Sequence, residues 1–321
     1  MQYKYLYRAF GLISLAVSLV VLFMTVQPTV PFWDCGEFSA AAIWQQVPHP
    51  PGAPLFLMIG KLFHMLIPFG DPGWRVNLVS VFSSALSVWL LYMITVKVIF
   101  NFRKELIKTM ADEVAIYGAS MVGALALLFS DTFWFNAVES EVYAMSTLFV
   151  AIVVFLMMRW FEESDNPGHE RFLLLIAYLM GLSTGVHLLS ILTIFSIVML
   201  VYFKKYKVDF SSFIIMGIFA IVIFFFVYPG IVKWLPALLD GSLPFKNACR
   251  EYIVEGKPLI TVLTVIGIAF IGFGLWWGHR KNNPYIKLVT MSILLMILGY
   301  TTYTQILLRS NAQPPMNENE P

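Results

Sequence analysis

Two acidic residues near the N-terminus, Asp34 and Glu37, stand three positions apart. On a helix they share one face, where one carboxylate can act as a general base while the other orients an acceptor. The same spacing before an apolar run is that of a helix-capping box with Asp34 as the N-cap residue. Both roles stay open, because a capping carboxylate keeps free lone pairs.

A proline-rich segment follows and carries a histidine. Four prolines among the seven residues 48–54 impose a stiff, non-helical path. That path could hold His49 over a site, or it could be a simple chain reversal with an exposed histidine. Further on, Arg75 is suited to bind phosphate oxygens through its forked guanidinium, or it is a long side chain reaching for the membrane interface.

Four more ionisable residues complete the candidate set: Glu139, Glu141, His187 and Arg309. The two glutamates are expected in the first turn of an apolar helix, where the helix dipole favours acids, or in contact with an acceptor, sugar hydroxyls or a cation. His187 is expected at a tight turn, where a buried, hydrogen-bonded histidine is common. We predict no metal site.

The composition indicates which elements must position these side chains. The 321 residues are 59% hydrophobic and 12% charged, with a mean hydropathy of +0.77. Soluble domains carry about 25% charged residues, so the composition excludes an ordinary soluble fold. A net charge of +2 offers no basic field for nucleic acid. Two cysteines do not make a disulfide framework or a zinc ribbon.

We therefore predict an all-α polytopic membrane protein with about nine spans of about 20 residues each. The stretch 172–203 is too long for one helix and is predicted to form two short helices with a turn at 183–187. The stretch 54–68 contains Lys61 and His64 and is predicted to be an interfacial or re-entrant helix in the first outer loop. The other predicted spans are 8–27, 76–100, 113–130, 138–160, 211–228, 258–277 and 287–306.

The basic residues predict the orientation. With a cytoplasmic N-terminus, 14 lysines and arginines lie inside and seven outside. A transmembrane domain, residues 1–308, then has outer loops at 28–74 and 229–257. The polar tail 309–321 is expected to lie outside and to lead into a further C-terminal region. All candidate residues fall at the outer face, and no predicted span carries an acid at its middle.

The order of these features resembles the GT-C membrane glycosyltransferases: an anchor helix, an acidic pair, a His-Pro-Pro turn, a non-crossing helix and an arginine opening the next span. Phe-Trp-Asp-Cys-Gly-Glu-Phe (32–38) and His-Pro-Pro-Gly-Ala-Pro-Leu-Phe (49–56) resemble one uncharacterised membrane family, domain of unknown function 2723. Val-Glu-Ser-Glu-Val-Tyr (138–143) and Gly-Leu-Ser-Thr-Gly-Val-His (181–187) resemble it too. A vertebrate protein O-mannosyltransferase that acts on plexin-type receptors is similar to that family.

The resemblance implies transfer, with inversion, of a mannose-like sugar from a polyprenyl-phosphate carrier to a protein Ser/Thr hydroxyl on the outer face. Asp34 would then be the base, Glu37 would help to place the acceptor, and Arg75 would neutralise the leaving phosphate. Contacts to donor or acceptor would come from His49, Glu139, Glu141, His187 and Arg309. The related mannosyltransferases have adjacent Asp-Glu, whereas two residues separate the acids here, which leaves the identity of the base open.

The family's character suggests a bacterial inner membrane with a periplasmic site. The expected partners are the lipid-linked donor, a hydroxyl acceptor and membrane lipid, and not nucleic acid. No cofactor is predicted beyond the donor, and a metal requirement stays open. Two alternatives remain: a transporter or flippase, which predicts related halves and midplane charges, and a non-catalytic scaffold, for which Asp34→Asn would be silent.

Overall fold

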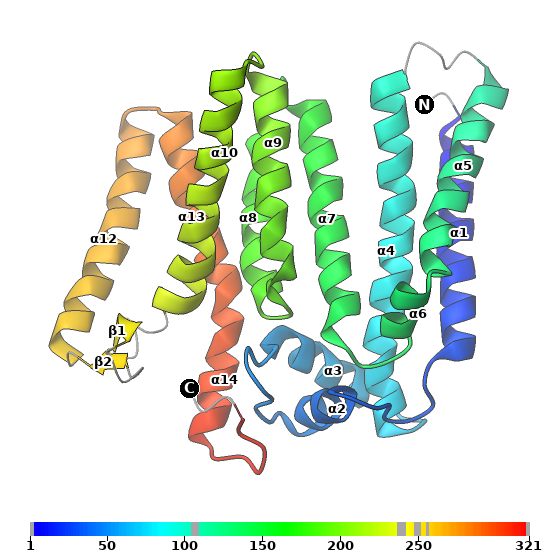
Figure 1. Cartoon of the computed structure of the whole chain (residues 1–321), viewed down its shortest axis with the longest axis horizontal. Coiled ribbons are helices and arrows are strands. Elements are labelled where there is room, and N and C mark those ends of the chain that lie inside the picture. Colours follow the sequence, from blue (N-terminus) through cyan, green and yellow to red (C-terminus); the bar gives the residue numbers. More distant parts are fainter. Residues whose placement is uncertain (1–2, 104–108, 236–241, 247–251, 255–256, 319–321) are drawn as a thin grey trace. The chain divides into compact units, whose positions relative to one another are not determined.

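The computed structural model describes residues 3–103, 109–235, 242–246, 252–254 and 257–318, and nearly all of them lie in helices (Figure 1). The chain divides into two compact units. Unit 1 comprises Met1–Arg159, Gly185–Ser190 and Thr301–Pro321, and unit 2 comprises Trp160–Thr184 and Ile191–Tyr300.

The helices that begin in unit 1 are α1 (Lys4–Thr25), α2 (Cys35–Trp44), α3 (Pro54–Leu66), α4 (Pro72–Arg103), α5 (Met110–Leu128), α6 (Asp131–Ala137), α7 (Val142–Glu163) and α14 (Thr304–Asn311). Short 3-10 helices span Leu188–Leu192 and Thr301–Tyr303.

Unit 2 contains α8 (Glu170–Thr184), α9 (Thr193–Lys205), α10 (Phe210–Phe225), α12 (Lys257–Arg280) and α13 (Pro284–Tyr300). A π-helical segment, Phe226–Trp234, continues α10. The strands β1 (Ser242–Lys246) and β2 (Tyr252–Val254) pair antiparallel. Beside this one small sheet the regular structure of the described residues is helical, and the predicted all-α class is confirmed. Within the predicted outer loop 229–257, residues 236–241, 247–251 and 255–256 lie outside the described residues.

Seven helical segments of the described chain are long and apolar enough to cross a membrane. They are Lys4–Thr25, Pro72–Arg103, Met110–Leu128, Val142–Glu163, Leu188–Lys205, Phe210–Trp234 and Pro284–Asn311. The stretch predicted as two helices does break where expected, because α8 ends at Thr184 and the next helical turn begins at Leu188. The count of about nine spans stays a prediction, since α8 has only 15 residues.

α3 is a 13-residue apolar helix, about 20 Å long at 1.5 Å per residue, which is shorter than a bilayer core of about 30 Å. Within unit 1, α2 and α3 pack on each other and on α4, at the end where α4 begins (Figure 1). The two helices of the first predicted outer loop are therefore present, and their interfacial position stays a prediction.

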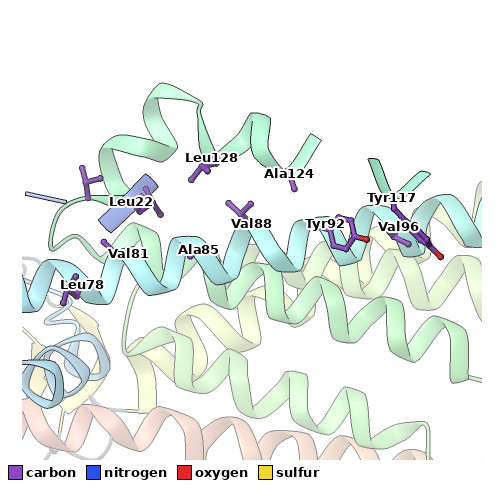
Figure 2. Packing of buried hydrophobic residues seen from close by; sticks show 12 residues of the cluster. Leu22, Leu78, Val81, Ala85, Val88, Tyr92, Val96, Tyr117, Ala124 and Leu128 are labelled. Carbon is purple, nitrogen blue, oxygen red and sulfur yellow. The ribbon is translucent and has the colours of Figure 1, made fainter. Parts of the chain in front are cut away.

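The core of unit 1 follows one face of α4. Leu78, Val81, Ala85, Val88 and Tyr92 are spaced three or four residues apart and are at most 2% exposed (Figure 2). This spacing is the apolar stripe of a buried helix face. The side chains that pack against it come from α1, α5 and α6 and include Leu22, Tyr117, Ala124, Leu128 and Ala137. This packed face holds α4 in place, and α2 and α3 pack at the end where α4 begins. That end, which includes Asp34, Glu37 and His49, is the polar end of unit 1.

Candidate functional site

α2 begins immediately after the first predicted acid. Asp34 occupies the N-cap position, but its exposed side chain makes no capping hydrogen bond. The predicted position is therefore right and the predicted capping contact is wrong. Glu37, in the first turn of α2, does not reach back to close a capping box either, because its carboxylate is bound elsewhere.

Glu37 binds His49 through both carboxylate oxygens. Oε2 lies 2.8 Å from the ring Nδ1 of His49, and Oε1 accepts the backbone N–H of the same residue. The ring of His49 also packs against Phe38, with the two ring centroids 5.5 Å apart. The proline-rich segment is non-helical, as predicted. It returns His49 to the helix that carries Glu37, so the histidine is held at the site.

The charges around His49 raise its pKa above the ordinary value. Partial burial of the ring lowers the pKa, but the hydrogen bond and the charge of Glu37 outweigh that effect, and the charges of Asp34 and Glu318 add to it. The net effect favours the imidazolium form. The site therefore combines a histidine that protonates more readily than usual with an excess of carboxylates.

A pair of buried carboxyl groups lies behind α2. Glu139 is 4% and Glu141 7% exposed, and the Cys35 thiol donates to Oε1 of Glu141 at 3.6 Å. Because α7 begins at Val142, both glutamates precede the helix, and the expectation that they sit in its first turn is wrong. Glu141 nevertheless accepts a hydrogen bond from the Val142 backbone, so it lies at the N-terminal end of α7, where the helix dipole still favours an acid.

Burial and mutual repulsion hold these two groups toward the neutral form. Burial raises the pKa of Glu139 to about 7, with a further rise from the charge of Glu141, while a hydrogen bond with Cys35 opposes both effects. Burial also raises the pKa of Glu141; the Cys35 hydrogen bond lowers it and the charge of Asp34 raises it. Burial raises the pKa of the Cys35 thiol, and both glutamates raise it further. The thiol is therefore a proton donor here, not a thiolate.

Serine hydroxyls join α2 to the segment that carries the buried acids. Ser39 and Ser140 share a hydrogen bond of 2.8 Å, and Ser140 donates to the carbonyl of Cys35 at 3.1 Å. Ser80, on α4, donates to the carbonyl of Glu141 at 3.3 Å. All three serines are at most 1% exposed. Buried hydroxyls placed in this way lock the relative position of two segments that are far apart in sequence.

One group of side chains in the described chain has the composition and spacing of a cation site. Potential ligand atoms of Asp34, Glu37 and His49 all lie within 4.8 Å of one another. Carboxylate oxygens and an imidazole nitrogen suit divalent cations. A cation there would compete with the bond between Glu37 and His49. The sequence analysis predicted no metal site and did not indicate that these three side chains lie close together.

Arg75 points its guanidinium at backbone carbonyls. Nε and Nη2 donate to Gly70 at 3.3 and 2.9 Å, Nε also donates to Phe69 at 3.0 Å, and Nη1 donates to His64 at 3.4 Å. These bonds fasten the turn after α3 to the start of α4. A guanidinium has five N–H donors, so donors remain for an anion, but the present contacts of Arg75 are structural.

The second arginine of the candidate set, Arg309, caps the other end of α2. Its Nε donates to the carbonyl of Gln45 and its Nη2 to that of Trp44 at 3.3 Å. The following tail then returns to the first loop, where Val47 and Asn317 form a parallel bridge. The backbone N–H of Val47 donates to Met316 at 3.1 Å. The tail is thus part of the wall beside His49, which the sequence analysis missed.

His187 lies on the turn that binds the start of α3. The carbonyl of Gly185 accepts the backbone N–H of Leu55 at 2.7 Å, and the His187 ring packs on Tyr143 with centroids 5.1 Å apart. Its Nδ1 accepts the Leu189 N–H at 3.1 Å, and burial lowers its pKa. The hydrogen bond matches the expectation, but the residue is half-buried and not fully buried as expected.

The structure thus brings most of the candidates to one end of unit 1. Asp34, Glu37 and His49 form the centre of the candidate site, and the charge of Glu318 acts on its histidine. Glu139 and Glu141 interact with the thiol of Cys35, the first residue of α2. Arg309 binds the C-terminal end of α2. Arg75 instead binds the turn after α3, and His187 lies on the turn whose Gly185 carbonyl binds the start of α3. Sequence reasoning missed Cys35, Ser39, Ser140 and the returning tail as parts of the site.

Comparison with known proteins places this site in a family. Residues 34–210 match the family described as the protein O-mannosyl-transferase TMEM260 N-terminal domain. The chain is 28% identical over 174 residues to protein O-mannosyl-transferase TMEM260 of Mus musculus. It is 25% identical over 164 residues to the protein of that name from Dictyostelium discoideum.

These matches cover 54% and 50% of the chain but only 23% and 18% of the two relatives. No solved structure matches the chain. The matched region begins at Asp34 and includes Glu37, His49, Glu139, Glu141 and His187. The apolar helices and the relatives together identify an integral, multi-pass membrane protein.

Proposed function

The chain belongs to the family of the TMEM260 protein O-mannosyl-transferase N-terminal domain, and on this premise we propose that it is a membrane glycosyltransferase that acts on protein. The donor is a polyprenyl phosphate that carries a mannose-like sugar, and the acceptor is a Ser or Thr hydroxyl. The fold is of the GT-C type. The site that does this work is the cluster of Asp34, Glu37 and His49.

One observation carries the proposal: the carboxylate of Asp34 is exposed and uncommitted to capping, while that of Glu37 is held by His49. A general base must be free to reach the proton that it removes. Asp34 is therefore the better base, and Glu37 with His49 is the group that places the acceptor. This assignment is our answer to the question of which of the two carboxylates is the base, which the sequence alone leaves open.

The proposed reaction is a single displacement. The acceptor hydroxyl oxygen attacks the anomeric carbon, its proton passes to Asp34, and the bond from that carbon to the phosphate oxygen breaks. The polyprenyl phosphate leaves with the bonding electrons, and the configuration at the anomeric carbon inverts. Arg75 keeps its proposed role of neutralising that phosphate, and Glu139, Glu141, His187 and Arg309 support the donor and acceptor pockets.

The proposed side of the membrane is the outer one, opposite a cytoplasmic N-terminus. In unit 1, α2 and α3 lie at the far end of α4 from the start of α1, which supports this placement (Figure 1). The distribution of lysines and arginines supports the same orientation. In a bacterial inner membrane this side would be periplasmic.

The test is transfer by the purified full chain in lipid nanodiscs. A panel of polyprenyl-phosphate sugars is offered with a Ser/Thr peptide, and the product is identified by mass and by the anomeric configuration of the new bond. We expect an inverted hexosyl peptide from the mannose donor. Asp34→Asn should lower the rate by about 10²–10⁴-fold, the usual contribution of a positioned base.

Asp131→Asn is the matched control, because Asp131 is also exposed and stands at the start of α6 in the same unit. Equal rates for wild type and Asp34→Asn, with the variant folded, would contradict the assignment of the base. Movement of the lipid across the nanodisc without peptide product would favour a flippase instead. A parallel reaction with EDTA asks whether the Asp34 cluster needs a cation.

A further inference from the structure

Unit 2 contains a cavity that the proposed reaction does not use. It has a volume of about 460 Å³ and lies among α8, α12 and α13. Its apolar lining consists of Leu174, Leu275, Pro284, Leu288 and Met291. Pockets that bind small ligands measure about 300–1,000 Å³ and are lined mainly by apolar side chains. The cavity is therefore of a size and character to take a ligand.

Close backbone contacts form two sides of this cavity. A Cβ on Gly278 of α12 would lie 3.1 Å from the backbone nitrogen of Lys287 on α13, so these helices nearly touch at that level. α8 meets α13 at Gly181, whose missing Cβ would overlap the carbonyl of Met296. Leu174 lies two helical turns before that contact, and the cavity occupies the space between these contact levels.

The mouth of the cavity is polar and mainly basic. Lys287 and His279 line it together with one acid, Glu170. The acid already has a neighbour, because its Oε1 is 3.6 Å from Nε2 of His169. Arg280 and Lys281 follow His279 directly at the end of α12, and Lys287 lies on α13, so the segment 279–287 carries four basic side chains.

Two tryptophans indicate where the opening of the cavity lies relative to the membrane–water interface. Trp276 is 50% and Trp277 38% exposed, and Arg280 and Lys281 lie over their rings at 5.1 and 5.4 Å. Exposed tryptophans at the end of an apolar helix are typical of the membrane–water interface. The cavity therefore opens where lipid phosphates lie, with its apolar interior directed toward the acyl chains.

We propose that this cavity, defined by the residues named above, binds an anionic phospholipid of the surrounding bilayer. One acyl chain fills the space lined by Leu174, Leu275 and Met291, and the phosphate lies against Lys287 and His279. The complementary charge of the mouth and the interfacial tryptophans favour a lipid of the membrane over a soluble ligand. Basic pockets between membrane helices bind anionic headgroups in this way.

The test measures the lipid that the full chain retains. Protein taken from nanodiscs of phosphatidylcholine and phosphatidylglycerol into mild detergent is analysed by native mass spectrometry. We expect wild type to retain phosphatidylglycerol in preference to phosphatidylcholine. The double variant Lys287→Gln with His279→Gln should reduce that preference about fivefold or more, since a lysine near a lipid surface alone contributes about a fivefold factor.

Lys204→Gln with Lys205→Gln is the matched control, because both lysines belong to unit 2 but lie within 3.2 and 3.0 Å of Asp165 and do not line the cavity. Leu174→Trp fills the cavity without changing charge and should abolish retention of either lipid. If that variant does not fold, Met291→Phe serves the same purpose. An unchanged preference in the Lys287 and His279 variant, or an equal loss in the control, would overturn the proposal.

Discussion

The polar end of unit 1 and the region around the cavity of unit 2 each have a histidine beside a glutamate, although only the glutamate of the second pair lines the cavity, and the two pairs are built differently. In unit 1, His49 and Glu37 are 12 residues apart and are joined by ring and backbone hydrogen bonds. In unit 2, His169 and Glu170 are sequence neighbours, with 3.6 Å between Nε2 and Oε1. The first pair exists only because the proline-rich segment folds back. We infer that the first pair serves the proposed transfer, and that the second, whose histidine also accepts a hydrogen bond from Trp160 at 3.2 Å, does not.

The same contrast extends to the packing around each pair. The polar end of unit 1 is held by hydrogen bonds between distant segments, such as Ser39 with Ser140 at 2.8 Å. The cavity of unit 2 is held by backbones in contact at glycines. Directional bonds place donor and acceptor atoms precisely enough for catalysis, whereas close helix packing leaves an apolar space of fixed shape. The predictions that follow test this difference.

The largest effect is expected from Glu37→Gln. The amide cannot hold an imidazolium as the carboxylate does, so the pKa of His49 should fall and the acceptor should lose its positioning group. We expect kcat/KM for sugar transfer to fall by about 10²-fold or more. Initial rates with a mannose donor and a Ser/Thr peptide measure it.

Glu170→Gln is the control from the other pair and should leave the rate within about twofold, because an exposed ion pair contributes little. His49→Gln, which removes the same contact from the opposite side, should approach the Glu37→Gln rate. A Glu37→Gln protein as active as Glu170→Gln would remove the functional distinction between the pairs.

The second effect concerns the glycine contacts of unit 2. Gly181→Ala introduces a Cβ into the carbonyl of Met296, and α8 and α13 must separate to accept it. Overpacking of this kind costs about 1–3 kcal/mol. We expect a clearly lower melting temperature in detergent. Gly217→Ala is matched in substitution and lies in unit 2, where a Cβ would meet nothing within 4 Å, so the variant should be neutral or more stable by up to about 1 kcal/mol. Similar melting of the two variants would show that the close contact is not needed.

The third effect separates the two arginines. Arg309→Ala removes the bonds to the carbonyls of Gln45 and Trp44 and should loosen the adjoining bridge between Val47 and the tail. Hydrogen bonds from a charged donor contribute about 1.5–3 kcal/mol when buried; for this partly exposed arginine we expect about 1 kcal/mol. The amide of Val47 should then exchange its hydrogen about fivefold faster.

Arg75→Ala is the comparison for this experiment, because Arg75 also donates to carbonyls at a helix end but serves the turn after α3. It should speed exchange in peptides that cover residues 64–70 and leave Val47 unchanged. If Val47 responds equally to both variants, or to neither, Arg309 does not hold the tail against the first loop.

The sequence could predict the features that depend on local pattern. The apolar stretches locate the membrane helices, the 32-residue stretch breaks at the expected turn, and α2 starts directly after Asp34. Hydrophobicity and proline placement act over a few residues, so a linear reading captures them. The side of the membrane on which the site lies stays a prediction.

The contacts of individual side chains could not be predicted in this way. Arg309 and Gln45 are 264 residues apart, and no periodicity links them. A guanidinium suits phosphate and a carbonyl equally well, so its sequence position does not reveal its partner. The burial of Glu139 depends on Cys35 approaching from α2, which is a tertiary event. The sequence did indicate that acidic residues gather near the ends of the predicted helices, which pointed to a site without revealing its contacts.

The last effect is a pH dependence of folding stability that differs in sign between the two regions. Burial raises the pKa of Glu139 to about 7 from an ordinary value of 4.5. As pH rises from 4.5 toward 7, the unfolded chain releases this proton while the folded chain retains it, so folding loses stability over that interval and the loss is constant above it. Glu139→Gln, neutral at every pH, should melt with wild type near pH 4.5 and a few degrees higher at pH 8.

Asp165 in unit 2 supplies the opposite case. Hydrogen bonds from Lys205 and Lys204 lower its pKa, so its stabilising contribution is present above its ordinary pKa of 3.8 and is lost as pH falls through the lowered value. Asp165→Asn should therefore melt at or slightly below the wild-type temperature at pH 8, since the group is fully exposed and screened. Melting curves of both variants from below pH 3.8 up to pH 8 measure the two signs together. A Glu139→Gln protein that is destabilised at pH 8 would mean that the buried carboxyl is ionised and paired with a cation at the polar end of unit 1.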